Sequence, residues 1–277
     1  MKSFIYKAGK QLVIILILIG PWTMAHGQVK LNADTLECHM VNFSAGILMP
    51  GGGSGPAEGG MRDLYKGPYL DFNLEWAYKW QSGWLASLDA DVWFGMSSDN
   101  LLRRSERYNG VFLPGDYAMS WAGLDGNVSA YNRALAVRPG VGHIFRVLPK
   151  NPNSGILLKM SGGWFMQKTV YSQEYTETPV MQLSGDYAKL YDHRRNGLML
   201  TESLGFIFMS NYITYVNVKL TFEVSQCFSW SSRPYQIDNV MGLNGKDEGR
   251  YFDLIYGVKL TWMFPFTGKT SYDYYYY

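Results

Sequence analysis

The chain has 277 residues, of which 16% are aromatic, and its formal net charge is only +2. So small a charge excludes a general electrostatic attraction to nucleic acid, and the length allows one large domain or two small ones. The mean hydropathy of −0.15 argues against a bundle of membrane helices. Aromatic- and glycine-rich chains of middling hydropathy are typical of many-stranded proteins, including membrane β-barrels.

Residues 1–27 have the layout of a cleavable signal peptide. Basic residues precede the apolar run LVIILILIG, and Ala25 and Gly27 place small residues just before position 28. The run is short for a transmembrane helix, although an uncleaved anchor is the alternative. No later stretch is long and apolar enough to form a membrane helix, so any membrane crossing of the mature chain must use strands.

From residue 36 onward the dominant signal is an alternation of apolar and polar residues, which predicts β-strands. In the clearest stretch, LDFNLEWAYKW, every second residue from Leu70 to Trp80 is apolar, and most of the residues between them are polar. Eight segments of this kind are expected. They cover residues 37–49, 70–80, 86–96, 134–148, 155–171, 197–209, 212–228 and 250–264.

The connections between these segments alternate in length. The short ones are expected at 81–83, 149–154 and 210–211, and the long ones at 50–66, 97–133, 172–196 and 229–249. This pattern predicts an all-β fold, an eight-stranded antiparallel transmembrane β-barrel over residues 28–266, in contact with outer-membrane lipids and with both termini in the periplasm. A soluble barrel of the lipocalin type is the alternative, but Trp and Tyr near strand ends fit a lipid-facing belt better.

An eight-stranded barrel is just wide enough to hold its own side chains. The polar strand faces direct charged residues of both signs into that interior. They are Asp71, Glu75, Asp89, Asp91, Arg138, Arg146, Lys159, Lys219, Glu223, Asp253 and Lys259. Because an unpaired buried charge costs several kcal/mol, we expect a plug of salt bridges rather than a path for protons or solutes. Glu202 falls in register with apolar residues, and a bulge would be needed to turn it inward.

The two cysteines of the chain are expected to remain free thiols. Cys38 begins the first predicted strand at the periplasmic end, and Cys227 ends the seventh at the extracellular end. About ten residues span the membrane in a strand, so the two should lie roughly 25 Å apart or more. A disulfide requires Cα atoms within about 7 Å.

Candidate catalytic groups are few. His39, His143 and His193 follow the signal peptide, and His143 lies on the predicted outward face, where a lipid hydrolase could place one. No serine partner is identifiable by spacing, and there is no metal-ligand spacing, phosphate loop or dinucleotide fingerprint. We therefore predict no catalytic, cofactor or metal site. The alternative is a barrel enzyme that acts on lipid or peptide.

The last third of the chain resembles a group of outer-membrane barrel proteins of Bacteroidetes. The resemblance lies in GDYAKLYDHRRNG, MSNYITYVNVKLTFEVSQ, FDLIYGVKLTWMFPF and the tyrosine-rich end, since the group carries a GYDRLTNG-like loop and a tyrosine-rich C-terminus. Residues 191–192 (YD) and 196–197 (NG) match, whereas 193–195 (HRR) depart. The resemblance implies a non-enzymatic accessory or structural subunit of a larger outer-membrane machine, such as those for barrel assembly or protein secretion.

Residues 267–277 (TGKTSYDYYYY) are expected to leave the barrel as a periplasmic tail, because Pro265 and Gly268 end the last strand. Its tyrosines are Tyr272, Tyr274, Tyr275, Tyr276 and Tyr277. They form either a docking peptide for a protein partner or part of an aromatic girdle at the lipid headgroups. Loops 97–133 and 172–196 are candidates for contact with an extracellular or laterally packed partner.

Overall fold

In this computed structural model the chain is described over most of its strands and several of its turns. The described residues are 37–54, 68–97, 112–113, 117–119, 125–148, 151–174, 185–186, 189, 192, 194–209, 217–232 and 250–266. No helix among them is both long and apolar enough to cross a membrane.

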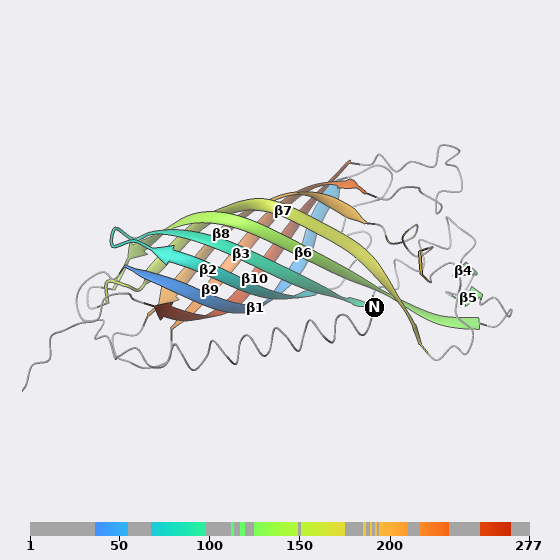
Figure 1. Cartoon of the computed structure of the whole chain (residues 1–277), viewed down its shortest axis with the longest axis horizontal. Coiled ribbons are helices and arrows are strands. Elements are labelled where there is room, and N and C mark those ends of the chain that lie inside the picture. Colours follow the sequence, from blue (N-terminus) through green and yellow to red (C-terminus); the bar gives the residue numbers. More distant parts are fainter. Residues whose placement is uncertain are drawn as a thin grey trace, which may run out of the picture.

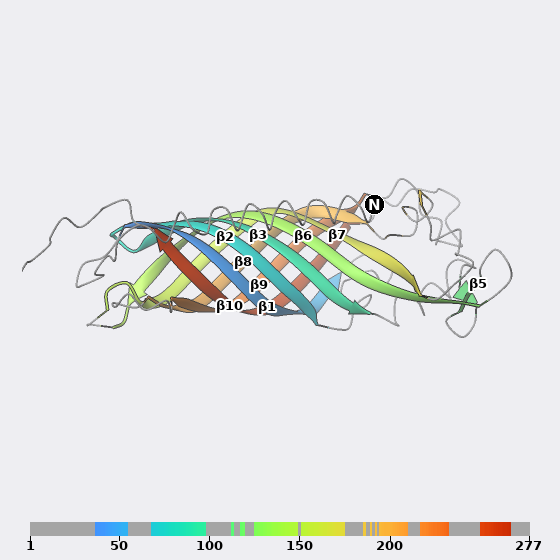
Figure 2. The same ribbon diagram turned by 60° about the horizontal axis from the view of Figure 1, so that its bottom comes forward.

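Eight long strands form a closed antiparallel ring, which confirms the predicted fold class. Their bounds are β1 Cys38–Ser54, β2 Tyr69–Lys79, β3 Trp84–Ser97, β6 Asp125–Arg146, β7 Gly155–Glu174, β8 Arg195–Phe208, β9 Val218–Ser231 and β10 Arg250–Phe266. The ring closes through the pairings of β1 with β10 and of β3 with β6 (Figures 1 and 2). Closure leaves no open sheet edge within the ring.

The strand alternation places apolar side chains outside the ring and polar ones inside. On β2, Leu70 and Phe72 are 49% and 52% exposed, whereas Asp71 and Glu75 are each only 1% exposed. A soluble lipocalin-type barrel would have the opposite arrangement, with apolar groups inside. An apolar exterior around a polar interior is the arrangement of a membrane-spanning barrel.

The two ends of the barrel differ in their connections. At one, the turn end, lie the described residues 80–83, 147–148, 151–154, 209 and 217, together with the start of β1 and the end of β10. The β2–β3 turn is tight: the Trp80 N–H donates to Trp84 O at 2.9 Å, and Gly83 has a φ of 90°, which a glycine adopts without strain. At the other, the loop end, β1, β3, β7 and β9 end and β2, β6, β8 and β10 begin, and longer stretches of sequence (55–68, 98–124, 175–194 and 232–249) separate these strands.

Several predicted strand bounds differ from those of the structure, and the largest differences are at the starts of β6 and β9. β6 begins at Asp125 instead of 134, so β6 and β7 continue as a ribbon beyond the points where β3 and β8 stop pairing with them, at Tyr131 and Gln167 (right side of Figure 1). The short strands β4 (Phe112–Leu113) and β5 (Tyr117–Met119) also fall within the expected loop, and β5 pairs with the start of β6. β9 begins at Val218 instead of 212, and the predicted turn at 210–211 lies outside the described residues.

Glu202 faces outward. The pairing of β8 with β7 and with β9 runs through Glu202 without a shift in register, opposite Met160 and Val224. The bulge that would turn this carboxylate into the interior is therefore absent from β8, and its side chain is exposed on the outer face.

Candidate functional site

The centre of the barrel interior contains charged side chains that bind one another. The Glu75 carboxylate accepts a hydrogen bond from Asn42 Nδ2 at 3.0 Å and from Lys159 Nζ at 2.7 Å, and it also pairs with Lys219. Lys159 in turn binds Asp89 at 2.7 Å. These residues belong to β1, β2, β3, β7 and β9, so the contacts connect strands from different sides of the ring.

Lys259, on β10, is the second centre of charge pairing. Its Nζ lies 2.6 Å from carboxylate oxygens of both Asp71 and Asp91 and 3.0 Å from Glu223. Asp91 also pairs with the guanidinium of Arg138 at 2.5 Å. Lys259 therefore pairs with three carboxylates, and Arg138 supplies a second positive charge to one of them, Asp91.

We call these groups the central charge cluster. Its members are Asp71, Glu75, Asp89, Asp91, Arg138, Lys159, Lys219, Glu223 and Lys259. None of these side chains is more than 12% exposed. Charges withdrawn from water in this way need partners, and here each has at least one within salt-bridge distance.

The remaining two predicted interior residues lie elsewhere. Asp253 lies 3.9 Å from Arg195, whose guanidinium stacks 3.5 Å above the ring of Tyr251. Arg195 was expected in a loop, so its interior position was missed. The interior position predicted for Arg146 is wrong: it is exposed at the turn end and donates to Gln81 O at 2.8 Å. The alternation ends there, because residues 145–148 are all exposed.

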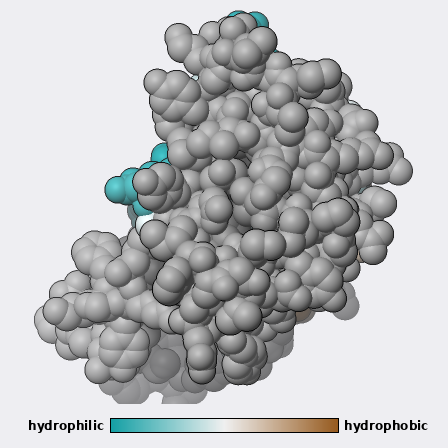
Figure 3. Space-filling view, turned by 90° about the vertical axis from the view of Figure 1, so that its right-hand side faces the viewer, coloured by the Kyte–Doolittle hydropathy of each residue, from teal (hydrophilic) through white to brown (hydrophobic). Residues whose placement is uncertain are grey.

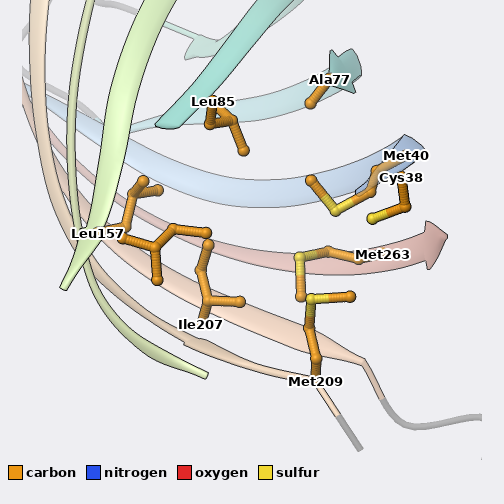
Figure 4. Close-up of a cluster of buried hydrophobic side chains, with 9 residues drawn as sticks. Cys38, Met40, Ala77, Leu85, Leu157, Ile207, Met209 and Met263 are labelled. Carbon is orange, nitrogen blue, oxygen red and sulfur yellow. The ribbon is translucent and has the colours of Figure 1, made fainter. Parts of the chain in front are cut away.

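On the turn side of the central charge cluster, the interior is closed by apolar side chains. This apolar layer consists of Cys38, Met40, Ala77, Leu85, Ile144, Leu157, Ile207, Met209 and Met263, each at most 2% exposed. In Figure 4 they point from several strands toward the barrel interior. The sequence analysis missed this layer. Near the turn end, apolar residues occupy inward as well as outward positions of the strands, so the alternation of polar and apolar residues does not mark which face is inside.

On the loop side, the interior contains aromatic rings. Trp93 on β3 lies between Tyr69, at 6.4 Å between ring centroids, and Phe165, at 5.4 Å. The Tyr69 hydroxyl accepts a hydrogen bond from Asn132 Nδ2 at 3.0 Å. The interior thus consists of an apolar layer, a charged centre and an aromatic layer in succession, which supports the plug over a solute path.

The two histidines among the described residues, His39 and His143, lie among aromatic rings on the outer face. The ring of His143 meets Trp84 at 5.0 Å and Phe145 at 4.7 Å, and His39 meets Trp76 at 5.7 Å. These positions at the turn end match an aromatic girdle at a membrane–water interface. Within the described part of the chain, no hydrogen bond between a serine and either histidine is found, and His193 lies outside it.

Both cysteines are free, as predicted, and both are buried. Cys38 belongs to the apolar layer at the turn end, whereas Cys227 lies opposite Asp253 and Met199 toward the loop end. The predicted tail tyrosines lie outside the described residues. Among the residues that the structure describes, no group of three or more His, Cys, Asp or Glu side chains is placed to hold a metal ion.

Glu202 is a polar group in the middle of the apolar outer face. Glu202 has apolar outward neighbours along β8 on both sides, Leu200 and Leu204, and Met160 beside it on β7. Within the described residues no hydrogen bond or ion pair reaches its carboxylate. Gln226 on β9, which pairs with Leu200, is its diagonal polar neighbour.

No protein-family model matches the chain, and no curated protein matches it. Solved structures similar to it include Ail, the attachment invasion locus protein of Yersinia pestis, at 9% identity, covering 83% of this chain and 99% of that one with a TM-score of 0.32. OprG from Pseudomonas aeruginosa shares 8% identity over 84% and 98% of the two chains, with a TM-score of 0.34. Values this low carry no function from one protein to another.

Proposed function

We propose that the chain is a non-enzymatic barrel of the bacterial outer membrane that serves as a structural or accessory subunit of a larger membrane assembly. Machinery for barrel assembly or protein secretion is the class that we favour. The observation that carries this proposal is Glu202, a carboxylate in the middle of the apolar outer face without a partner in the described residues.

A carboxylate facing hydrocarbon is unfavourable, although less so than the ~2–4 kcal/mol of a midplane arginine or lysine. Three apolar outward residues of β8 lie on its turn side and two on its loop side, so water at either interface is distant. Ionisable groups in such positions mark contacts and pathways within membrane assemblies. A donor on a neighbouring membrane protein would satisfy Glu202, and Gln226 would offer the same partner an amide.

The barrel interior supports a structural role. The central charge cluster, the apolar layer and the aromatic layer occupy the space that a pore would need. We infer that the turn end faces the periplasm, as short turns do in outer-membrane barrels. The tail with Tyr272 and residues 274–277 would then be available to a periplasmic partner, and the long loops to the cell exterior.

Affinity purification in mild detergent tests this proposal with three forms of the protein: the full chain, Glu202→Leu, and a chain that ends at Phe266. We expect stable partners with the full chain and at least a tenfold lower recovery with Glu202→Leu, because truncating one member of a desolvated charge pair costs about 2–5 kcal/mol. The truncated chain is expected to lose those partners that the tail binds.

Met160→Leu is the matched control, because Met160 lies directly opposite Glu202 on the same face and the change leaves the face apolar. It should leave every partner in place. If all forms recover the same partners, neither Glu202 nor the tail is the dock. If the full chain recovers none, the accessory role itself is wrong.

A further inference from the structure

Three cations lie side by side on the outer face near the loop end. Arg133 on β6 and Lys168 on β7 are direct cross-strand partners. Arg194 directly precedes Arg195, which pairs with Gln167, and a nitrogen of the Arg194 guanidinium lies 3.7 Å from the sulfur of Met166, the next outward residue of β7 after Lys168. We call Arg133, Lys168 and Arg194 the cation row.

The cation row borders the apolar outer face. Along the same strands, the next outward residues toward the turn end are Leu135, Met166 and Asn196, followed by Val137, Trp164 and Leu198. The side chains of the row therefore lie where acyl chains would end and lipid headgroups would begin. Viewed from the loop end, hydrophilic described residues are visible at the edge of the molecule (Figure 3).

The chain itself compensates this charge only in part. Like charges directly opposite each other on a sheet destabilise it. Arg133 donates to Gly95 O at 3.0 Å and lies 5.1 Å from the Phe94 ring, and an Arg194 nitrogen lies 3.7 Å from Met166 sulfur. Within the described residues none of the three cations forms an ion pair. Asp192 is the nearby acid, and its carboxylate accepts the Arg194 backbone N–H at 3.2 Å.

We propose that the cation row binds the phosphate groups of an anionic lipid in the leaflet at the loop end. Guanidinium groups bind phosphate through two parallel hydrogen bonds, and Lys168 between them adds a compact point charge. The lipid's acyl chains would lie on the apolar surface around Trp164 and Leu198. In an outer membrane the lipid of that leaflet is a phosphorylated glycolipid. The inference rests on the outer-membrane location and on the orientation inferred under the proposed function, with the turn end toward the periplasm, but not on any protein partner.

Binding of a lipid with two phosphates on its sugar headgroup, doped into neutral detergent micelles, tests the proposal on the purified full chain. The test compares the parent with the triple variant Arg133→Gln, Lys168→Gln and Arg194→Gln. Each of the three cations contributes electrostatic attraction to the lipid phosphates. With all three removed, we expect the triple variant to bind about 100-fold more weakly. Binding of the dephosphorylated form of the same lipid to the parent should be similarly weak.

Arg250→Gln is the matched control, because Arg250 is exposed at the same end but pairs with Trp230 rather than with another cation. It should bind as the parent does. The gel mobility of unheated samples reports that each variant is folded. The proposal is overturned if a folded triple variant binds as tightly as the parent, or if the phosphates on the lipid make no difference. Displacement of the lipid by an equal concentration of inorganic phosphate would also overturn it, because the site would then be one for a free anion.

Discussion

Replacing Lys259 by methionine is expected to lower the free energy of unfolding of the barrel by about 3–5 kcal/mol. Lys259 lies within 3.0 Å of carboxylate oxygens from Asp71, Asp91 and Glu223. Its removal leaves Asp71 and Glu223 without the salt bridges that they form in the described structure, whereas Asp91 keeps its pair with Arg138. Denaturant unfolding in lipid vesicles, followed by tryptophan fluorescence, measures the difference.

Lys168→Met is the control for this prediction, because it removes the same charge from a side chain that faces outward and has no ion pair within the described residues. Its unfolding free energy should stay within about 0.5 kcal/mol of the parent. Adding Asp71→Asn to Lys259→Met should recover part of the loss, because one of the stranded charges disappears. Equal stability of Lys259→Met and the parent would show that the cluster does not hold the barrel together.

The second large effect is expected in the apolar layer. Leu157 on β7 is 0% exposed inside the barrel, and its neighbour Leu158 is 48% exposed on the outer face. Leu157→Ala should cost about 2–5 kcal/mol, because it leaves a cavity among close-packed side chains. Leu158→Ala should cost clearly less, because lipid can fill the space that the side chain leaves. The same vesicle unfolding assay compares the two.

A larger loss for Leu158→Ala than for Leu157→Ala would mean that the assignment of inside and outside on β7 is reversed. That result would also contradict the apolar layer as the closure at the turn end. The pair therefore tests the placement of the strand as well as the energy of the contact.

The barrel itself was predictable from the sequence, because strand alternation is a local property of neighbouring residues. LDFNLEWAYKW, for example, has the predicted outward Leu70 and inward Asp71 in the structure. The alternation fails where polar residues occupy both faces. Around Asn127 and Ser129 it therefore missed the first part of β6, and around Arg195 it missed the start of β8.

The residues of the candidate sites come together through strand pairing and register, and the sequence alone does not give the register. The charged residues of the central cluster were predictable as a set, but their pairing follows from register across the ring. The cation row was missed for the same reason: Arg133, Lys168 and Arg194 are far apart in the chain and meet only through the pairings of β6, β7 and β8. Arg146 was misplaced because the sequence does not show that the alternation of inward and outward side chains ends at residue 145, just beyond the last pair of β6 with β3 at His143.

We propose that paired charges and an apolar layer close the interior, which would make the barrel a structural unit and not a pore. Conductance of the purified full-length barrel in a planar lipid bilayer tests this directly. We expect no stable single-channel steps from the parent protein, with a known porin inserted in the same bilayer as a positive control. Reproducible steps of constant size from the parent barrel would contradict the closed interior and would make solute transport the leading function.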